Sequence, residues 1–433
     1  MRITYISIKL IYHKNLKNMT NNNGLFLRSF DSISLCLCYF IIFFPILEML
    51  ENFEGLFDNI KVILIGLYFL VFLNATPAIY KGICRQGILF FCSLLLLFVL
   101  YLDWKWNLPY HIDMKEYVEL VNIHLFRYCI PMLLLGISLN NMDRLFGYLK
   151  IMAMVLLVIY GLQYFVFSSI FQWVSYSQEA GYLCATSCII FWVLYLYKKD
   201  YICLVLVPLS ILFILLSGSR GPLLTLLLGM VLSFGVVKKP KTNKIILYVV
   251  VLFMLLILWA LLKDVVLDTL FDFADQHGLS TRTIEKMSTN EMSGDDSRDM
   301  LKSLAISYSF DNFPYGTGIF NDRFYIYTKY YASFSKTSDI FGSYCHNFFV
   351  ELCMQFGLIF GVLLSLYAAL RLLIMLLRKT NKMSTKLAYV LLLTIGFFPL
   401  LISRSYLTFP YFYLLIGFCF SYKRIDSIKK KIK

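Results

Sequence analysis

Arg220 lies where two apolar runs meet, within Ser217-Gly-Ser-Arg-Gly-Pro222. A serine can cap a following helix and a proline suits its first turn, so this pattern predicts a helix that begins directly after the arginine. The N–H groups at a helix start favour anions, and a guanidinium beside them favours phosphate. The residue is therefore a candidate phosphate clamp. The alternative is an arginine that only extends its charge to the membrane surface.

Two further arginines, Arg282 and Arg298, lie downstream in a polar stretch of the chain. A guanidinium contacts two phosphate oxygens at once, which suits a diphosphate. Carboxylates also lie close by in the sequence, at Asp295, Asp296 and Asp299. Spacing alone therefore leaves two interpretations open, a diphosphate contact and a surface ion pair.

His346 and Asn347 open another apolar run, and Glu351 follows about one turn later. The dipole at a helix start disfavours a charged imidazolium, so the histidine is expected to be neutral there. A neutral imidazole can accept a proton, as a general base does. Asn347 and Glu351 would then orient the ring or hold a sugar hydroxyl. The alternative role for this histidine is a helix cap or an interface contact.

Two arginines elsewhere in the apolar part of the chain are candidate substrate-binding residues. Arg127 falls near the middle of a predicted span, one turn after His124, and Arg404 falls at the end of a later span. An arginine at membrane depth is costly and usually faces a partner or a wet cavity. Each could contribute to a basic cavity, and each could be structural.

No pattern in the chain indicates a metal or another cofactor. The nearest approach to an acidic metal motif is the pair Asp295-Asp296, which we interpret as a solvated pair. The 11 cysteines are odd in number, lie mostly in apolar runs and form no Cys-x-x-Cys pairs. We expect small buried side chains from them, and neither a metal site nor a cofactor.

The composition places these residues in a membrane protein. Hydrophobic residues make up 59% of the 433 positions and charged residues 15%, with a mean hydropathy of +0.71. The apolar residues fall in repeated runs of roughly 17–25 residues, the length of a transmembrane helix. Alternating polarity, the mark of a membrane barrel, is lacking. We predict an all-α polytopic membrane protein with about twelve transmembrane helices, at residues 31–50, 60–79, 86–102, 118–139, 145–167, 179–197, 201–217, 221–237, 244–263, 346–372, 386–403 and 408–421.

Charge alternates along the connections between these runs. One set of loops and both termini are rich in lysine and arginine, and the other set is acidic or mixed. Basic loops stay in the cytoplasm, which accounts for the formal net charge of +14 without nucleic acid. The long stretch 264–345, with twelve acidic and seven basic residues, then becomes one large extracytoplasmic loop. This predicts an N-terminal membrane domain at 1–263, the loop at 264–345 and C-terminal membrane helices at 346–433.

The order of these motifs resembles the O-antigen polymerase and O-antigen ligase superfamily. The shared pattern is Ser219-Arg220-Gly221 at an outer helix start, then loop arginines, a Pro-x-Gly-x-Gly turn at 314–318, and the His346-Asn347 pair. The resemblance covers roughly residues 200–370 motif by motif. It implies a membrane glycosyltransferase in which Arg220 and Arg298 bind diphosphate and His346 serves as a base or positions the acceptor. Arg282 matches the pattern less closely.

Within that superfamily we expect a Wzy-type polymerase that joins polyprenyl-diphosphate-linked repeat units into O-antigen or a capsular or exopolysaccharide. The same donor chemistry also fits an O-antigen ligase or a protein O-oligosaccharyltransferase. The alternative from another class is a polysaccharide flippase or secondary transporter, which would show repeated halves and ionisable coupling residues near the bilayer midplane. This chain has no evident repeats, and its acidic residues lie near helix ends. The expected location is the bacterial inner (plasma) membrane, with the site facing the periplasm or the outside and both termini in the cytoplasm. Its expected partners are the lipid-linked glycan donor and acceptor, membrane lipid, a flippase and a chain-length regulator.

Overall fold

The computed structural model describes residues 31–51, 58–106, 115–165, 178–217, 219–238, 296–331, 340–378 and 382–427, together with three short pieces at 268–269, 271–273 and 275–276. Every regular element in these ranges is helical. The all-α expectation is therefore confirmed for the described part of the chain. The division into domains at 263 and 345 stays a prediction.

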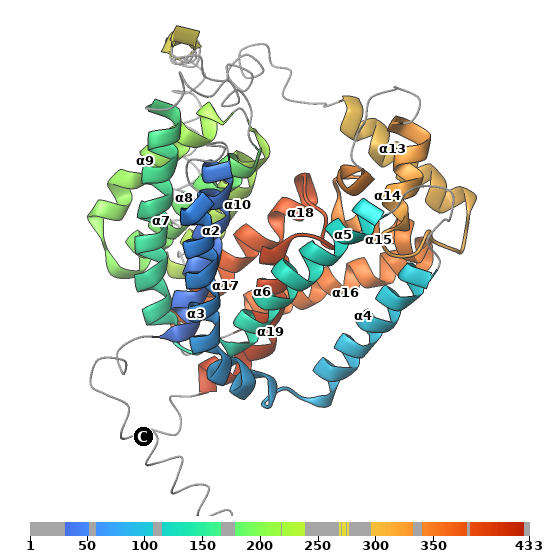
Figure 1. Cartoon of the computed structure of the whole chain (residues 1–433), viewed down its shortest axis with the longest axis horizontal. Coiled ribbons are helices and arrows are strands. Elements are labelled where there is room, and N and C mark those ends of the chain that lie inside the picture. The colour runs from blue at the N-terminus through green and yellow to red at the C-terminus, as the bar shows by residue number, and fades with distance from the viewer. Residues whose placement is uncertain are drawn as a thin grey trace, which may run out of the picture.

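The helices follow one another with few interruptions (Figure 1). In chain order they are α2 (Ser32–Glu51), α3 (Asp58–Ile83), α4 (Ile88–Trp106), α5 (Lys115–Asn122), η1 (Ile123–Cys129), α6 (Ile130–Ser138), α7 (Met142–Phe165), α8 (Gln178–Lys198), α9 (Tyr201–Leu216), α10 (Gly221–Lys238), α13 (Asp296–Asp311), α14 (Asn321–Ile326), η3 (Tyr327–Tyr331), η5 (Ile340–Gly342), α15 (Phe348–Phe356), α16 (Leu358–Leu377), α17 (Met383–Gly396), α18 (Phe398–Ile402) and α19 (Pro410–Ser427).

Apolar runs of membrane length form helices in the described residues. Six of these helices are long and apolar enough to cross a bilayer, namely Val62–Ile83, Val118–Ser138, Met142–Leu162, Gln178–Lys198, Leu358–Leu377 and Met383–Ile402. Four shorter apolar helices, at Ser32–Phe43, Tyr201–Leu216, Gly221–Val237 and Pro410–Tyr422, accompany them. The chain is therefore a multi-pass membrane protein. The count of twelve spans stays a prediction, and the expected span 244–263 lies outside the described residues.

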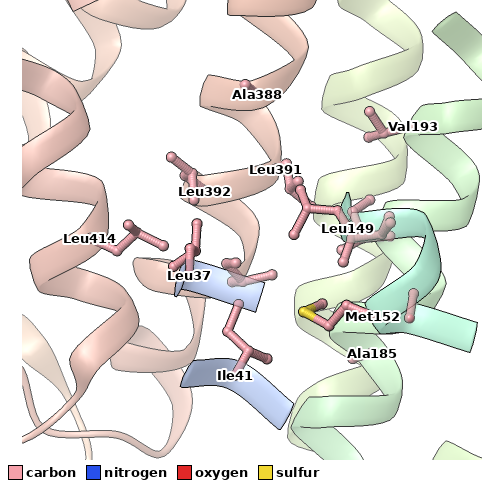
Figure 2. Packing of buried hydrophobic residues seen from close by; sticks show 14 of the residues in the cluster. Leu37, Ile41, Leu149, Met152, Ala185, Val193, Ala388, Leu391, Leu392 and Leu414 are labelled. Carbon is pink, nitrogen blue, oxygen red and sulfur yellow. The ribbon is translucent and has the colours of Figure 1, made fainter. Parts of the chain in front are cut away.

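The core is built from helices that are far apart in the sequence. Leu37 of α2, Met152 of α7, Ala185 of α8, Leu391 of α17 and Leu414 of α19 pack together there (Figure 2). Large apolar side chains on α3, α4 and α16 instead point outward and are exposed. An exposed apolar surface of this extent is what a lipid-facing helix presents.

Loops expected on the same side of the membrane meet at the same end of the bundle. Lys150 of α7 pairs with Asp200, and Asp143 accepts a hydrogen bond from Tyr197 of α8. These residues flank two of the basic connections. At the other end, Tyr182 near the start of α8 contacts Ser403 after α18. The packing thus agrees with the alternation of charge, while the side of the membrane stays a prediction.

Three expected spans are not single α-helices. The span 118–139 is divided between α5, η1 and α6, with a π-helical segment in the middle. The span 346–372 is broken at Gly357, whose φ of 79° and ψ of 160° are accessible essentially only to glycine. The span 386–403 is split into α17 and α18 where Pro399 begins a new helical turn. These breaks lie inside apolar runs, so hydropathy does not reveal them.

The Pro-x-Gly-x-Gly turn closes against the break at Gly357. The N–H of Thr317 donates to Met354 O over 2.8 Å, and the N–H of Gly318 donates to Gln355 O over 2.9 Å. Both acceptors are carbonyls at the C-terminal end of α15, which have no partner within their own helix. A Cβ on Gly316 would lie 2.3 Å from Gln355 O. The absence of a side chain at Gly316 therefore lets the turn pack directly against the C-terminal end of α15.

Replacement of Gly357 by alanine should destabilise the protein. The conformation is strained for any side chain, and the new Cβ would lie 2.0 Å from Pro314 O. We expect a loss of about 1–3 kcal/mol from the backbone strain alone. The readout is the unfolding midpoint of the purified protein in detergent. Gly235→Ala is the matched control, because nothing lies within 4 Å of its Cβ position. Equal midpoints for the two variants would contradict the assigned role of Gly357.

Candidate active site

The start of α10 is packed tightly against the start of α8. A Cβ on Gly221 would lie 2.9 Å from Tyr182 Oη, and a Cβ on Gly181 would lie 2.8 Å from Ser217 Oγ. The helix begins at Gly221 with Pro222 next, as the Ser-Arg-Gly-Pro pattern predicts. Arg220 directly precedes this helix start and is half-buried. Its backbone position is thus fixed by the contact between two helices.

Arg220 and Arg298 line the same cleft, although 78 positions separate them in the sequence. The cleft has a volume of about 490 Å³. Arg220 comes from the start of α10 and Arg298 from the first turn of α13, while Leu401 and Ile402 of α18 form another wall. Two of the three residues expected to be catalytic are therefore brought together.

Lys302 adds a third cation to the cleft, which the sequence analysis did not single out. It lies one turn after Arg298 on α13, and residues four apart share one face of a helix. This spacing was a signal for it. Lys302 Nζ lies 3.2 Å from Oδ1 of Asp299, the one carboxylate among the described lining residues. A concave surface with more cations than carboxylates attracts anions.

His346 is held beside this cleft by the residue that follows Ile402. His346 Nδ1 lies 3.2 Å from Ser403 O, and Tyr344 Oη donates to the same carbonyl over 2.8 Å. A carbonyl only accepts hydrogen bonds, so Nδ1 carries a proton in this contact. In the neutral ring, Nε2 then carries the lone pair that a general base needs. The geometry thus fixes which nitrogen can accept a proton.

Asn347 acts as the N-cap of α15. Its Oδ1 accepts from Phe349 N over 3.1 Å and from Val350 N over 3.2 Å, while its Nδ2 donates to Leu401 O over 3.5 Å. The side chain therefore ties the helix start to α18, next to His346. Of the two roles expected for Asn347, the geometry matches orientation of the site.

Three ionisable residues form a buried cluster that reaches His346 through the ring of Tyr344. Asp322, Arg323 and Glu351 are all fully buried. The Arg323 guanidinium lies 5.1 Å from the centre of the Tyr344 ring, and its Nη2 donates to Thr408 Oγ1 over 3.3 Å. Glu351 accepts a hydrogen bond from Ser405 Oγ. The cluster therefore supports both Tyr344 and the segment after Ser403. Asp322 and Arg323 give no signal in the sequence, because an Asp-Arg pair in a polar stretch resembles a solvated one.

The charges in this cluster are compatible with burial if Glu351 is protonated. Glu351 belongs to α15, which precedes the membrane-length helix Leu358–Leu377. Burial raises the pKa of Glu351, and the nearby Asp322 carboxylate raises it further. Burial also raises the pKa of Asp322, but the adjacent Arg323 cation opposes that change. Protonation of Glu351 therefore removes one negative charge from a buried cluster that also holds the Asp322 carboxyl and the Arg323 guanidinium.

Two of the other candidates, Arg404 and Arg127, are not among the described residues that line the cleft. Arg404 pairs with Glu179 and stacks on Tyr182, at 5.1 Å from its ring centre, where it lines a separate cavity. Arg127 is exposed, with its guanidinium 5.7 Å from the Tyr128 ring centre. Arg282 lies outside the described residues. The described residues hold no cluster of three or more histidine, cysteine, aspartate or glutamate side chains that could bind a metal.

Residues 203–366 match the O-antigen ligase family. This confirms the resemblance to the O-antigen polymerase and ligase superfamily, and it supports a membrane enzyme of the ligase or polymerase type. The matched region carries Arg220, Arg298 and His346, whereas Tyr182 and Ser403 lie outside it. No curated protein and no solved structure is significantly similar to this chain.

The buried Glu351 should make stability depend on pH. Well below its ordinary pKa of about 4.3, Glu351 is protonated in both the folded and the unfolded state, so it adds no pH dependence. At higher pH the unfolded chain releases the proton and the folded protein keeps it, so the free energy of unfolding falls until the raised pKa is reached. A tenfold difference in proton affinity between the folded and unfolded states corresponds to about 1.4 kcal/mol.

Glu351→Gln should remove this dependence. The measurement is the unfolding midpoint of wild type and variant across the pH range from about 4.5 upward. Relative to the variant, the wild type should lose stability as pH rises. Asp143→Asn, at the opposite end of the bundle, is the control and should follow the wild type. A constant difference between wild type and Glu351→Gln would show that Glu351 is ionised in the folded protein.

Proposed function

We propose that this protein is a membrane glycosyltransferase that polymerises polyprenyl-diphosphate-linked repeat units into O-antigen or a capsular or exopolysaccharide. The observation that carries the proposal is the shared cleft of Arg220 and Arg298, next to the segment that holds His346. The O-antigen ligase match over 203–366 covers all three residues and supports the donor chemistry. A new repeat unit as the acceptor is the finer part of the proposal.

In the proposed reaction the donor diphosphate occupies the cleft and contacts Arg220, Arg298 and Lys302. The bond between the anomeric carbon of the glycan and the diphosphate oxygen breaks, and its electron pair remains on the diphosphate. Fixed cations stabilise that developing charge without having to reorganise. The acceptor hydroxyl forms the new glycosidic bond, and its proton passes to Nε2 of His346. The products are the extended glycan and free polyprenyl diphosphate.

The same proposal includes the orientation in the membrane. The cleft, Ser403 and the start of α8 lie at one end of the bundle, and the basic connections around Lys150 and Lys198 lie at the other. We assign the end that holds the cleft to the outer side of the bacterial plasma membrane and both termini to the cytoplasm. An O-antigen ligase or a protein O-oligosaccharyltransferase would use the same cleft for the same donor with a different acceptor.

Lysine in place of Arg220 or Arg298 should still lower the rate. It keeps the charge but loses the two-pronged contact with phosphate oxygens. Alanine should cost about 10²–10³ in rate, as is typical when one preorganised donor is removed. The measurement is elongation of lipid-linked repeat units by purified protein in nanodiscs. Arg85→Ala, exposed at the opposite end, is the control. Full activity in Arg298→Ala would show that Arg298 does not bind the diphosphate and serves only in a surface ion pair.

Substitutions at His346 should separate proton transfer from positioning. His346→Ala should accumulate single repeat units, because it removes the ring that contacts both Tyr344 and the Ser403 carbonyl. His346→Gln can still donate to that carbonyl but cannot accept a proton near neutral pH. We expect both variants to be inactive at wild-type protein level. Recovery of most activity by glutamine would assign His346 to acceptor positioning.

A further inference from the structure

We propose that the cavity containing Arg404 is the binding site for the acceptor sugar, separate from the cleft that holds the donor diphosphate. The cavity has a volume of about 240 Å³ and opens among α2, η1, α8 and the residues that precede α19. Ligand pockets in proteins run from about 300 Å³ upward, so this one suits a small part of a ligand, such as a sugar at the end of a glycan. The inference rests on the proposed function and specifies its acceptor.

One short segment of the chain lines both spaces in turn. Leu401 and Ile402 border the cleft, and Arg404 borders the cavity. Ser403 lies between them, and its carbonyl is the atom that fixes His346. A donor in the cleft and an acceptor in the cavity would therefore approach the histidine from the two sides of a single residue. A group-transfer enzyme needs this arrangement, because both reactants must be held in place together.

The lining of the cavity has the chemistry that recognises a sugar. Aromatic rings at Tyr128, Phe409 and Tyr411 provide faces on which sugar rings stack. Glu179 and Thr408 supply groups for hydroxyls. The buried Nε of Arg404 has no hydrogen-bond acceptor among the described residues. A buried donor without an acceptor is unusual, and it shows that the pair with Glu179 does not satisfy the whole guanidinium.

The balance of charge distinguishes the two occupants. In the cavity, the Arg404 guanidinium is paired with the Glu179 carboxylate, so the two charges compensate each other. In the cleft, the described lining residues set three cations, Arg220, Arg298 and Lys302, against a single carboxylate at Asp299. A diphosphate is therefore drawn to the cleft, and a neutral sugar meets no electrostatic penalty in the cavity.

Two probes test the assignment on the purified, full-length protein. The first is the lipid-free repeat-unit oligosaccharide, released by mild acid from the lipid-linked units that accumulate in a strain lacking this gene. The second is inorganic diphosphate. Each is titrated as an inhibitor of elongation, and its direct binding is measured by calorimetry. Two variants alter the cavity, Tyr128→Leu on η1 and Tyr411→Leu on α19, so a folding failure in one leaves the other. Arg298→Ala alters the cleft, and Asp143→Asn is the control at the opposite end.

We expect the cavity variants to weaken inhibition by the oligosaccharide alone, and the cleft variant to weaken inhibition by diphosphate alone. Each cavity variant should raise the inhibition constant of the oligosaccharide about tenfold, the effect of about 1.4 kcal/mol of lost contact, and leave that of diphosphate unchanged. Arg298→Ala should do the reverse, and Asp143→Asn should change neither. If Arg298→Ala weakens both probes while the cavity variants weaken none, the acceptor shares the cleft and the inference is overturned with the proposed function intact.

Two other outcomes are also decisive. The cavity carries apolar residues at Phe40, Ile41 and Met132, so a polyprenyl tail is the rival occupant. If a polyprenyl alcohol binds and the cavity variants abolish its binding while the oligosaccharide never binds, the cavity is a lipid site and the inference is overturned. If the wild type elongates nothing and binds neither probe, the proposed function itself fails.

Discussion

The carbonyl of Ser403 is the point on which the arrangement of the candidate site depends. It accepts the hydrogen bond from Tyr344 and lies against the ring nitrogen of His346, while the hydroxyl of the same residue contacts Tyr182. Three separate parts of the chain are thereby joined at one residue. The carbonyl is available because α18 ends at Ile402, and the last carbonyls of a helix have no partner within it. The end of a short helix thus provides the acceptor that sets the orientation of the histidine.

A second constraint is the contrast between an apolar bundle and a charged end. The helices of the core meet through apolar side chains, so they fix the backbone without specifying any chemistry. The polar groups are collected where α8, α10 and α15 begin and α18 ends. Even the buried Asp322–Arg323–Glu351 cluster belongs to this end, where it supports Tyr344 from below. Burial of these groups costs less free energy when Glu351 is protonated, because the cluster then holds one carboxylate fewer.

The sequence predicts the helices well and their breaks poorly, for a physical reason. Hydropathy reports where a chain can be buried in lipid or core, so the runs that became α2, α7 and α8 are evident. The break at Gly357 depends on one backbone conformation, and an apolar run contains no trace of it except the glycine itself. Residues 403–409 look like a plain connection for the same reason. Their importance arises from contacts with Tyr182, Tyr344 and Glu351, which are distant in the sequence.

The candidate site shows the same limits. Residue chemistry and order were enough to select Arg220, Arg298 and His346, but no local pattern shows that the two arginines share one cleft. The helical spacing of Lys302 from Arg298 was visible and was overlooked. Arg404 was selected for its charge, and the structure gives that charge a partner in Glu179. Tertiary contacts decide whether an arginine can bind a ligand anion or is paired with a carboxylate of the protein. The sequence alone does not contain those contacts.

The family match includes the cations of the cleft but not the residues that line the second cavity. Residues 203–366 contain the cations of the cleft and the histidine, yet Ser403, Tyr182 and every described lining residue of the second cavity lie outside this range. The matched region therefore carries the proposed donor chemistry, and the surrounding helices position it. Donor recognition needs the same diphosphate contacts whatever glycan is attached, whereas the acceptor differs between polymerases and ligases. A chain built this way can keep one set of residues for the common step and change its partner sugar through α2, η1, α8 and the start of α19, which line the other cavity.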